Sequence, residues 1–323
     1  MYGAGAVGGV VGARLHQAGH EVVLIARGAH REAIARDGLV LEAPEGTSTL
    51  DIPVAAAPDA LDWSGAPVVL LAVKGQHTMT AVEALVGCVP PATPIVCAQN
   101  GVENERLVLR HFANTYGMCV MCATTHLRPG HVEAHYSPVT GLLDLGRFPQ
   151  GEDDVTGAVS AALRESTFGS ESRPEIMRWK YRKLLMNLAN AVEALCGPGN
   201  SRSPLAQAAG SEGETCLRAA GIAFASVEED AERRRELTPT SDAVGSIGRV
   251  KRYGGGSTWQ SLARGAGSVE VDLLNGEIVL LGRLHGVATP VNELLQQLTV
   301  EAIRSGAPPG SHSTEELLER ALG

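Results

Sequence analysis

Three glycines near the start of the chain constrain its fold more than any other feature. Gly3, Gly5 and Gly8 form the pattern G-x-G-x-x-G, followed by a helix-like run and the apolar, strand-like segment 20–26. Between a strand and a helix, the first glycine permits a tight turn, the second lets the backbone approach a pyrophosphate, and the third permits close helix–strand packing. This order of segments predicts the first βαβ unit of a dinucleotide-binding domain. The alternative is a glycine-rich turn that binds no ligand.

The start of the expected helix completes the predicted phosphate site. Its N–H groups are free to bind an anion, and the positive end of the helix dipole favours negative charge there. We therefore expect a dinucleotide to contact Gly3, Gly5, Ala6, Val7 and Gly8.

The predicted first strand is unusually short. Only Met1 and Tyr2 precede the first glycine, although this strand is central in a doubly wound sheet and normally carries several apolar residues. We therefore expect that the natural protein begins upstream of Met1 or that the sequence given is shortened.

The end of the second predicted strand indicates which dinucleotide is bound. Enzymes that prefer NAD place an Asp or Glu there to hold the ribose 2′-hydroxyl, whereas an arginine accommodates a 2′-phosphate. Arg27 follows the apolar segment 22–26, while Glu21 lies at the opposite end of that strand. Arg31, one helical turn later, could add a second cation. The pattern predicts NADP(H), with Arg27 at the 2′-phosphate; the alternative is a surface arginine at a strand end.

Strand and helix signals alternate in the first half of the chain, and helical periodicity dominates the second half. Apolar runs recur at 20–26, 39–42, 68–73, 94–98 and 117–123, and added strands are expected over 131–146. Later helices are expected at 175–195, 257–264, 270–285 and 291–304, with a mostly helical region over 203–253 and a tail or terminal helix over 308–323. We predict an α/β Rossmann-type doubly wound sheet over 1–165 and an all-α domain over 166–323.

Polar side chains follow two of the predicted strands. Lys74 comes directly after the run 68–73, and Gln99 and Asn100 come directly after 94–98. Because ligands bind outside the carboxyl ends of the strands in such sheets, we expect these polar side chains to line a cleft. Ordinary loop solvation is the alternative.

Composition and charge argue against several classes of partner. The chain of 323 residues has a formal net charge of −9, which favours neither a nucleic acid nor a membrane surface. No apolar run is long enough to span a membrane, and no secretory signal opens the chain. The six cysteines are scattered and the ten histidines show no ligand spacing, so we expect reduced thiols and no metal. We predict a cytoplasmic enzyme that acts on a small molecule.

Three polar residues share one stripe of the expected helix 175–195. Lys183, Asn187 and Asn190 fall at i, i+4 and i+7. The segment is otherwise apolar nearly all round, so the helix should be buried. Because burial removes hydration from an ammonium group, Lys183 would release its proton more readily and would suit general acid catalysis. The alternative is that Lys183 reaches solvent, as lysines usually do.

A second polar cluster follows the glycines at 254–256. Ser257 could cap a helix, and its hydroxyl could also meet a substrate carboxylate. Glu270 would begin the helix 270–285, where the helix dipole favours its charge. The alternative for Glu270 is an ordinary first-turn acid.

Taken together, these motifs resemble the ketopantoate reductase family over essentially the whole chain. The motifs are Gly3-x-Gly5-x-x-Gly8, Lys74-x-Gln76, Gln99-Asn100-Gly101, Lys183-x-x-x-Asn187, Ser257-Thr-Trp-Gln260 and Glu270-Val-Asp272-x-x-Asn275-Gly276. The resemblance implies NADPH-dependent reduction of 2-dehydropantoate to pantoate by hydride transfer to C2. It also implies that Lys183 is the general acid, that Glu270 hydrogen-bonds the reacting oxygen, and that the substrate is bound by Ser257 and Asn187. By the same resemblance, Asn100 and Lys74 would line the cofactor side of the cleft.

Some positions depart from the family pattern. Ala191 stands where the family often has a second substrate-binding asparagine, and Asn190, which we expect to bind substrate, stands one position earlier. The segment around Trp259 also differs from the family pattern. These differences leave open another small 2-oxo acid or 3-hydroxy acid as the substrate. A non-catalytic NADPH-binding regulatory protein is a further alternative, but it would not need the lysine, asparagine and glutamate together. A homodimer is left open.

Overall fold

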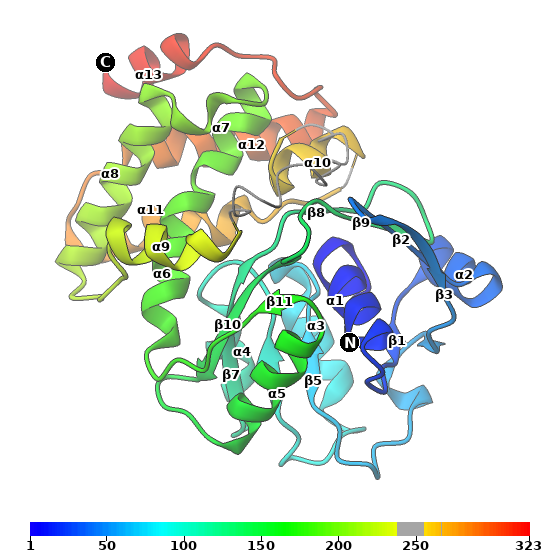
Figure 1. Cartoon of the computed structure of the whole chain (residues 1–323). Coiled ribbons are helices and arrows are strands. Elements are labelled where there is room, and N and C mark those ends of the chain that lie inside the picture. Colours follow the sequence, from blue (N-terminus) through cyan, green and yellow to red (C-terminus); the bar gives the residue numbers. More distant parts are fainter. Residues whose placement is uncertain (238–254, 266) are drawn as a thin grey trace. The chain divides into compact units, whose positions relative to one another are not determined.

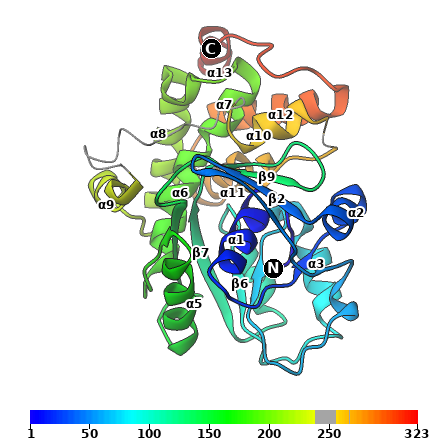
Figure 2. The same cartoon turned by 45° about the vertical axis from the view of Figure 1, so that its right-hand side comes forward.

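The chain packs into two compact units. The computed structural model describes residues 1–237, 255–265 and 267–323 (Figures 1 and 2). One unit comprises Met1–Lys180 and Ser226–Arg252, and the other comprises Tyr181–Ala225 and Tyr253–Gly323. The division falls at Lys180 rather than after residue 165, where we expected it, because the intervening segment packs on the first unit. There the Leu145 N–H donates to the Glu171 carbonyl at 3.1 Å, and Lys180 forms an ion pair with Glu105.

The first unit is built on a mostly parallel sheet. Its strands are β1 (Leu24–Ile25), β4 (Val54–Ala55), β5 (Val69–Leu71), β6 (Ile95–Cys97), β7 (Thr115–Met121), β10 (Gly141–Arg147) and β11 (Phe168–Gly169). β4 pairs with β1, and the remaining strands run in the order β5-β6-β7-β10-β11. These pairs are parallel except for β10 and β7.

Tyr2 joins the two parts of this sheet in place of a full first strand. It forms parallel bridges to Ile25 and to Leu71, and its N–H donates to the Leu70 carbonyl at 2.8 Å. The order is therefore β4, β1, Tyr2, β5, β6, β7, which is that of a doubly wound dinucleotide-binding sheet. The predicted fold class is confirmed, although the central strand is little more than one residue long.

Helices cover both faces of the sheet. They are α1 (Ala6–Gln17), α2 (Gly28–Asp37), α3 (Thr78–Leu85), α4 (Asn104–Leu109) and α5 (Asp154–Glu165), with the 3₁₀ turns η1 (Pro58–Ala60) and η2 (Gly75–His77). Leu70 and Val96 pack in one apolar cluster with Val10 of α1, whereas Leu71 packs in another with Val82 of α3. Because neighbouring strand residues point to opposite faces, β5 and β6 each contribute to both clusters.

A smaller sheet lies beside α1 in the same unit. Its strands are β2 (Leu39–Ala43), β3 (Gly46–Leu50), β8 (Thr124–Thr125) and β9 (His131–Ala134), in the order β3-β2-β9-β8. The expected strand 39–42 therefore belongs to this sheet and not to the main one. α9 (Val227–Arg233) and η4 (Arg234–Leu237) also belong to the first unit. The Arg233 guanidinium of α9 donates to both carboxylate oxygens of Asp144 in β10, at 2.8 and 2.6 Å.

The described part of the second unit is helical and contains no strand. Beyond the end of α6 (Ile176–Asn187), it holds α7 (Ala189–Cys196), η3 (Asn200–Arg202), α8 (Pro204–Ala219), α10 (Ser257–Ala263), η6 (Val271–Leu273), α11 (Asn275–His285), α12 (Pro290–Ser305) and α13 (Thr314–Leu322). Val192, Leu205, Ile278 and Leu295 are fully buried in it, as is Leu317 of the terminal helix α13. Within the predicted helical region 203–253 and the glycine triplet, residues 238–254 lie outside the described residues.

Two predicted helices are interrupted. The predicted helix 175–195 divides at Leu188 into α6 and α7, and the Asn275 side chain donates to the Leu188 carbonyl there at 3.3 Å. The predicted helix 270–285 is a 3₁₀ turn, η6, followed by α11. Leu274 has φ −117° and ψ −86°, which no α-helix accommodates.

Candidate active site

The three motif glycines are required for different reasons. Gly3 has φ +101°, and a Cβ there would lie 2.8 Å from the Val73 nitrogen. A Cβ on Gly8 would lie 1.9 Å from the Gly3 carbonyl oxygen and 2.9 Å from the Ala72 Cβ. A Cβ on Gly5 would meet no atom within 4 Å. The turn and the helix packing therefore require Gly3 and Gly8, whereas only something outside the protein would require Gly5.

The first turn of α1 has the properties of an anion site. Gly5 is the N-cap residue and offers no side-chain cap, and the first turn holds no acidic residue. Ala6 and Val7 are half-buried at this turn. Because the first N–H groups of a helix have no partner within it, they can donate to a phosphate.

Hydrogen bonds hold the turn that follows β6. The Gln99 amide nitrogen donates to the Thr78 hydroxyl at 2.8 Å, that hydroxyl donates to Asn104 Oδ1 at 2.7 Å, and Asn104 donates to the Asn100 carbonyl at 2.9 Å. The side-chain oxygen of Asn100 is buried and has no hydrogen-bond partner among the described residues. Lys74 is half-buried just before η2, at the carboxyl end of β5. The edge of the sheet therefore holds an acceptor, Asn100 Oδ1, ready for a donor from a ligand.

Arg27 lies at the carboxyl end of β1. It is exposed as the N-cap residue of α2, whose first turn holds no acidic residue. Burial raises the pKa of the Tyr2 hydroxyl, and the nearby Arg27 guanidinium opposes that shift. Arg31 of α2 is half-buried, and its Nε has no hydrogen-bond partner among the described residues. Two cations, Arg27 and Arg31, are therefore present at this end of the strand, and the first turn of α2 carries no acid.

Two lysines lie one turn apart on α6, and their surroundings differ. Lys180 is 3% exposed and forms an ion pair of 2.6 Å with Glu105. Lys183 is half-buried. Asn187, one turn after Lys183, is 4% exposed, and its amide nitrogen is buried without a hydrogen-bond partner among the described residues. A buried donor of this kind is costly unless a ligand or water accepts from it.

The helix break at Leu188 places Asn190 on α7, close to the start of α10. The Asn190 amide nitrogen donates to the Ser257 hydroxyl oxygen at 3.3 Å. One turn later, the Glu193 carboxylate accepts from the Gly256 N–H at 2.8 Å. Ser257 is the first residue of α10 and Gly256 is its N-cap, so the capping role considered for Ser257 is wrong. Since its oxygen accepts the Asn190 bond, the Ser257 hydroxyl can direct its proton elsewhere.

Glu270 is 7% exposed and is the N-cap residue of η6. It precedes a single 3₁₀ turn and therefore lacks the longer helix whose dipole we expected to favour its charge. The sequence analysis did not identify the ion pair of Lys180 and Glu105, because no local pattern signals a contact between residues 75 positions apart. Glu193 was missed as well, although it lies one helical turn after Asn190.

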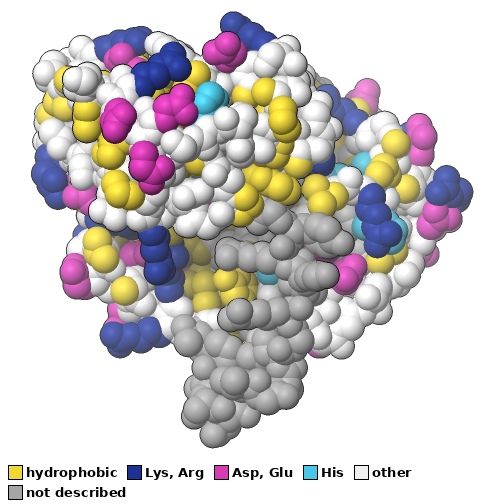
Figure 3. All heavy atoms as spheres, turned by 90° about the horizontal axis from the view of Figure 1, so that it is seen from above, with side chains coloured by type: hydrophobic (Ala, Val, Ile, Leu, Met, Phe, Trp, Pro, Cys, Tyr) yellow, Lys and Arg dark blue, Asp and Glu magenta, His cyan; other side chains and the backbone are white. Residues whose placement is uncertain are grey.

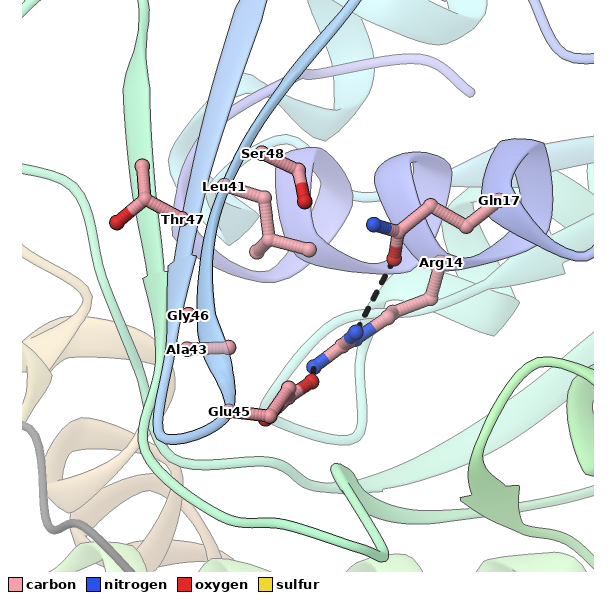
Figure 4. A pocket seen from close by; sticks show the side chains of 8 residues that line it. All are labelled: Arg14, Gln17, Leu41, Ala43, Glu45, Gly46, Thr47 and Ser48. Carbon is pink, nitrogen blue, oxygen red and sulfur yellow. Dashed lines mark hydrogen bonds and ion pairs between the residues drawn. The ribbon is translucent and has the colours of Figure 1, made fainter.

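The cavity of about 160 Å³ shown in Figure 4 is not lined by the predicted cofactor or substrate residues. Arg14, Gln17, Leu41, Ala43, Glu45, Gly46, Thr47 and Ser48 line it, and none of them was a predicted site residue. The Arg14 guanidinium points at Glu45 and pairs with it. Because that carboxylate neutralises the only cation lining the cavity, a phosphate gains no attraction there.

Several other kinds of site find no support among the described residues. No group of three or more His, Cys, Asp or Glu side chains there could hold a metal ion. No helix there is both long and apolar enough to cross a membrane. On the face shown in Figure 3, lysine and arginine side chains alternate with aspartate and glutamate. The described part of that face has no broad basic surface of the kind that binds nucleic acid.

Comparisons with known proteins show the family of the chain. The family model described as "Ketopantoate reductase PanE/ApbA" matches residues 1–150, and its C-terminal counterpart matches residues 175–302. The 2-dehydropantoate 2-reductase of Halobacterium salinarum is 30% identical over 329 residues, covering 95% of this chain and 99% of that protein. The enzyme of that name from Pyrococcus horikoshii is 26% identical over 306 residues, covering 92% and 95%.

Solved structures share the fold. A PanE/ApbA family ketopantoate reductase from Ralstonia eutropha has a TM-score of 0.75 at 28% identity, covering 95% of this chain and 99% of that one. A D-mandelate dehydrogenase, solved with NADH and anilino(oxo)acetate, has a TM-score of 0.76 at 22% identity, covering the same shares of the two chains.

Proposed function

Because the chain belongs to the ketopantoate reductase family, we propose that it reduces 2-dehydropantoate to pantoate with NADPH. The family consists of nicotinamide-dependent reductases, and the fold is theirs. The observation that carries the proposal is the Asn187 amide nitrogen, which is buried one turn after Lys183 and lacks a partner among the described residues. A small oxo acid is a ligand that would satisfy this donor.

Lys183 is the better general acid of the two lysines on α6. Lys180 has its three N–H groups directed at the Glu105 carboxylate and at the carbonyls of Gln99 and Met118. Donating a proton to a substrate would break this arrangement. Lys183 occupies the next turn, at the spacing from Asn187 that the family motif requires.

The residues around the glycine motif fit NADP(H). The uncrowded Gly5 and the N–H groups of Ala6 and Val7 would bind the pyrophosphate, and Arg27 would bind the 2′-phosphate. The unpartnered Asn100 oxygen would accept from the nicotinamide half, which Lys74 would also line. When bound, the cofactor supplies the hydride for C2 of the oxo acid.

The protein's own groups would handle charge and protons. Asn187 and Ser257 would donate to the substrate, with Asn190 holding the Ser257 hydroxyl. The Lys183 ammonium would stabilise the C2 oxygen as it gains negative charge and then transfer a proton to it, giving the hydroxy acid. Glu270 would accept a hydrogen bond from that oxygen once it is protonated. The first unit would thus hold the cofactor, and the second would hold the substrate and supply the acid.

A related oxo acid is the second candidate substrate. Ala191 stands where the family often has a substrate-binding asparagine, and it is 1% exposed, so it supplies no amide to a ligand. The far end of the substrate is therefore held by different groups in this chain. From the sequence we also propose that the protein is cytoplasmic. Sedimentation would measure whether it forms a homodimer.

A substrate panel tests the proposal. The chain would be assayed with NADPH and with NADH on 2-dehydropantoate, on a 2-oxo acid lacking its hydroxyl, and on an aromatic 2-oxo acid, following nicotinamide absorbance. We expect the highest kcat/KM with NADPH and 2-dehydropantoate. A higher value with another acid would favour the second candidate. Tight NADPH binding without oxidation on any acid would favour a regulatory protein.

A further inference from the structure

The first unit contains a buried ion pair that the proposed reaction does not use. The Lys180 Nζ lies 2.6 Å from Oε1 of Glu105, and the two side chains are 2% and 0% exposed. Nζ also donates to the carbonyl of Gln99 at 2.9 Å and to that of Met118 at 3.2 Å. The ammonium group thus joins α4, the turn after β6, and β7.

Stability alone does not account for such a pair. Removing two charges from water costs free energy that their attraction often fails to return. Burial raises the pKa of the Glu105 carboxyl, and the Lys180 ammonium opposes that shift. The fold also leaves room for the pair, because a Cβ on Gly117 would lie 3.3 Å from both Glu105 Oε1 and Lys180 Cδ. An ion pair whose burial is unfavourable, and which the small residue Gly117 accommodates, indicates that the pair serves to position neighbouring groups.

The pair holds the turn that carries Asn100. Side-chain bonds from Gln99 to Thr78 and from Asn104 to the Asn100 carbonyl already restrain this turn. Lys180 adds a third restraint, on the Gln99 backbone carbonyl, and Glu105 orients Lys180. The Asn100 side-chain oxygen remains as an acceptor in a fixed place.

We propose that Lys180 and Glu105 are positioning residues for the nicotinamide half of the cofactor. In a doubly wound sheet the dinucleotide crosses the point where the strand order reverses. With the 2′-phosphate at Arg27, after β1, the nicotinamide half lies over the ends of β5 and β6, where Asn100 stands. The inference rests on the proposed use of NADP(H).

The test replaces the pair with apolar residues of similar size. Each single variant, Lys180→Met or Glu105→Leu, leaves a buried charge without its partner, so both should melt well below the wild type. The double variant K180M/E105L should melt near the wild type. Its Kd for NADPH should rise about tenfold, the effect of losing one well-placed hydrogen bond. Its Kd for the cofactor lacking nicotinamide, 2′-phospho-ADP-ribose, should stay unchanged.

A control separates positioning from stability. The side chain of Arg233 in α9 is similarly buried, at 3% exposed, and pairs with the buried Asp144 at 2.6 Å. Arg233→Met should lower the melting temperature without changing either Kd. A double variant that folds and binds NADPH as tightly as the wild type would overturn the inference, as would equal weakening of both ligands. If the wild type binds NADPH but does not reduce 2-dehydropantoate, the proposed function fails, and these binding measurements still decide the inference.

Discussion

Replacing Gly5 or Gly8 by alanine should separate cofactor binding from folding. At Gly5 the new methyl group meets no protein atom within 4 Å, and the backbone angles of φ −69° and ψ −156° suit any residue. Alanine is a poorer N-cap than glycine, so the free energy of unfolding should fall by only about 0.5–1 kcal/mol, or roughly 1–2 °C in melting temperature. The methyl group would, however, occupy the space that the pyrophosphate approaches.

The expected loss in NADPH affinity follows from the contacts displaced. A hydrogen bond to a charged group contributes about 1.5–3 kcal/mol, so displacing one phosphate contact should raise the Kd about 10–100-fold. Titration of NADPH fluorescence at constant ionic strength measures this change, and thermal unfolding followed by circular dichroism measures the stability.

Gly8→Ala is the matched control. Its Cβ would lie 1.9 Å from the Gly3 carbonyl oxygen, so the helix must move away from the strand. Crowding of this degree should lower the free energy of unfolding by about 3 kcal/mol or more. The variant should therefore be less folded and should also bind NADPH less tightly. The reasoning is refuted if Gly5→Ala binds NADPH as the wild type does, or if Gly8→Ala melts at the wild-type temperature.

Three other perturbations test other parts of the site. Lys183→Ala should lower kcat for 2-dehydropantoate by about 10²–10⁴-fold with little change in NADPH affinity, and turnover within a few-fold of the wild type would end its role as the acid. Arg27→Ala should raise the KM for NADPH about tenfold and leave that for NADH unchanged, because only NADPH carries the 2′-phosphate; equal effects on both would show that Arg27 does not select. His30 Nε2 donates to the Ala4 carbonyl at 2.7 Å, its Nδ1 accepts from the Gly130 N–H at 2.9 Å, and burial lowers its pKa. Because the pKa of His30 is lower in the folded state, the stability that neutral His30 contributes is complete above the ordinary value of 6.5 and is lost as the pH falls below it. Denaturant titrations at several pH values should therefore show that the free energy of unfolding falls less on acidification in His30→Asn than in the wild type.

The local geometry of the proposed cofactor site was predictable from the chain. A tight turn, a close helix–strand contact and an uncapped helix N-terminus each need particular residues at short spacing, so the glycine motif indicated them directly. Arg27 is similar, because its place at a strand end follows from counting along the chain. The confirmed fold class has the same origin, since alternation of strand and helix signals leads to a parallel sheet.

Helix boundaries were less predictable. At Leu188, where α6 gives way to α7, the carbonyl accepts a hydrogen bond from Asn275, 87 positions away, and no local signal marks this boundary. Local patterns likewise did not predict the change from 3₁₀ turn to α-helix after Glu270, or that Gly256 rather than Ser257 is the N-cap of α10.

The order of residues alone therefore determined the kind of sheet, the glycine turn and the family, because these depend on propensities and spacings within one or two elements. The sequence also singled out Lys183 as the proposed catalytic lysine, and tertiary structure decided that Lys180, one turn earlier, is paired with Glu105 and that Asn190 donates to Ser257. Both lysines have the same intrinsic chemistry. They differ only in which groups the folded chain brings near them, and that is settled by packing between segments distant in sequence.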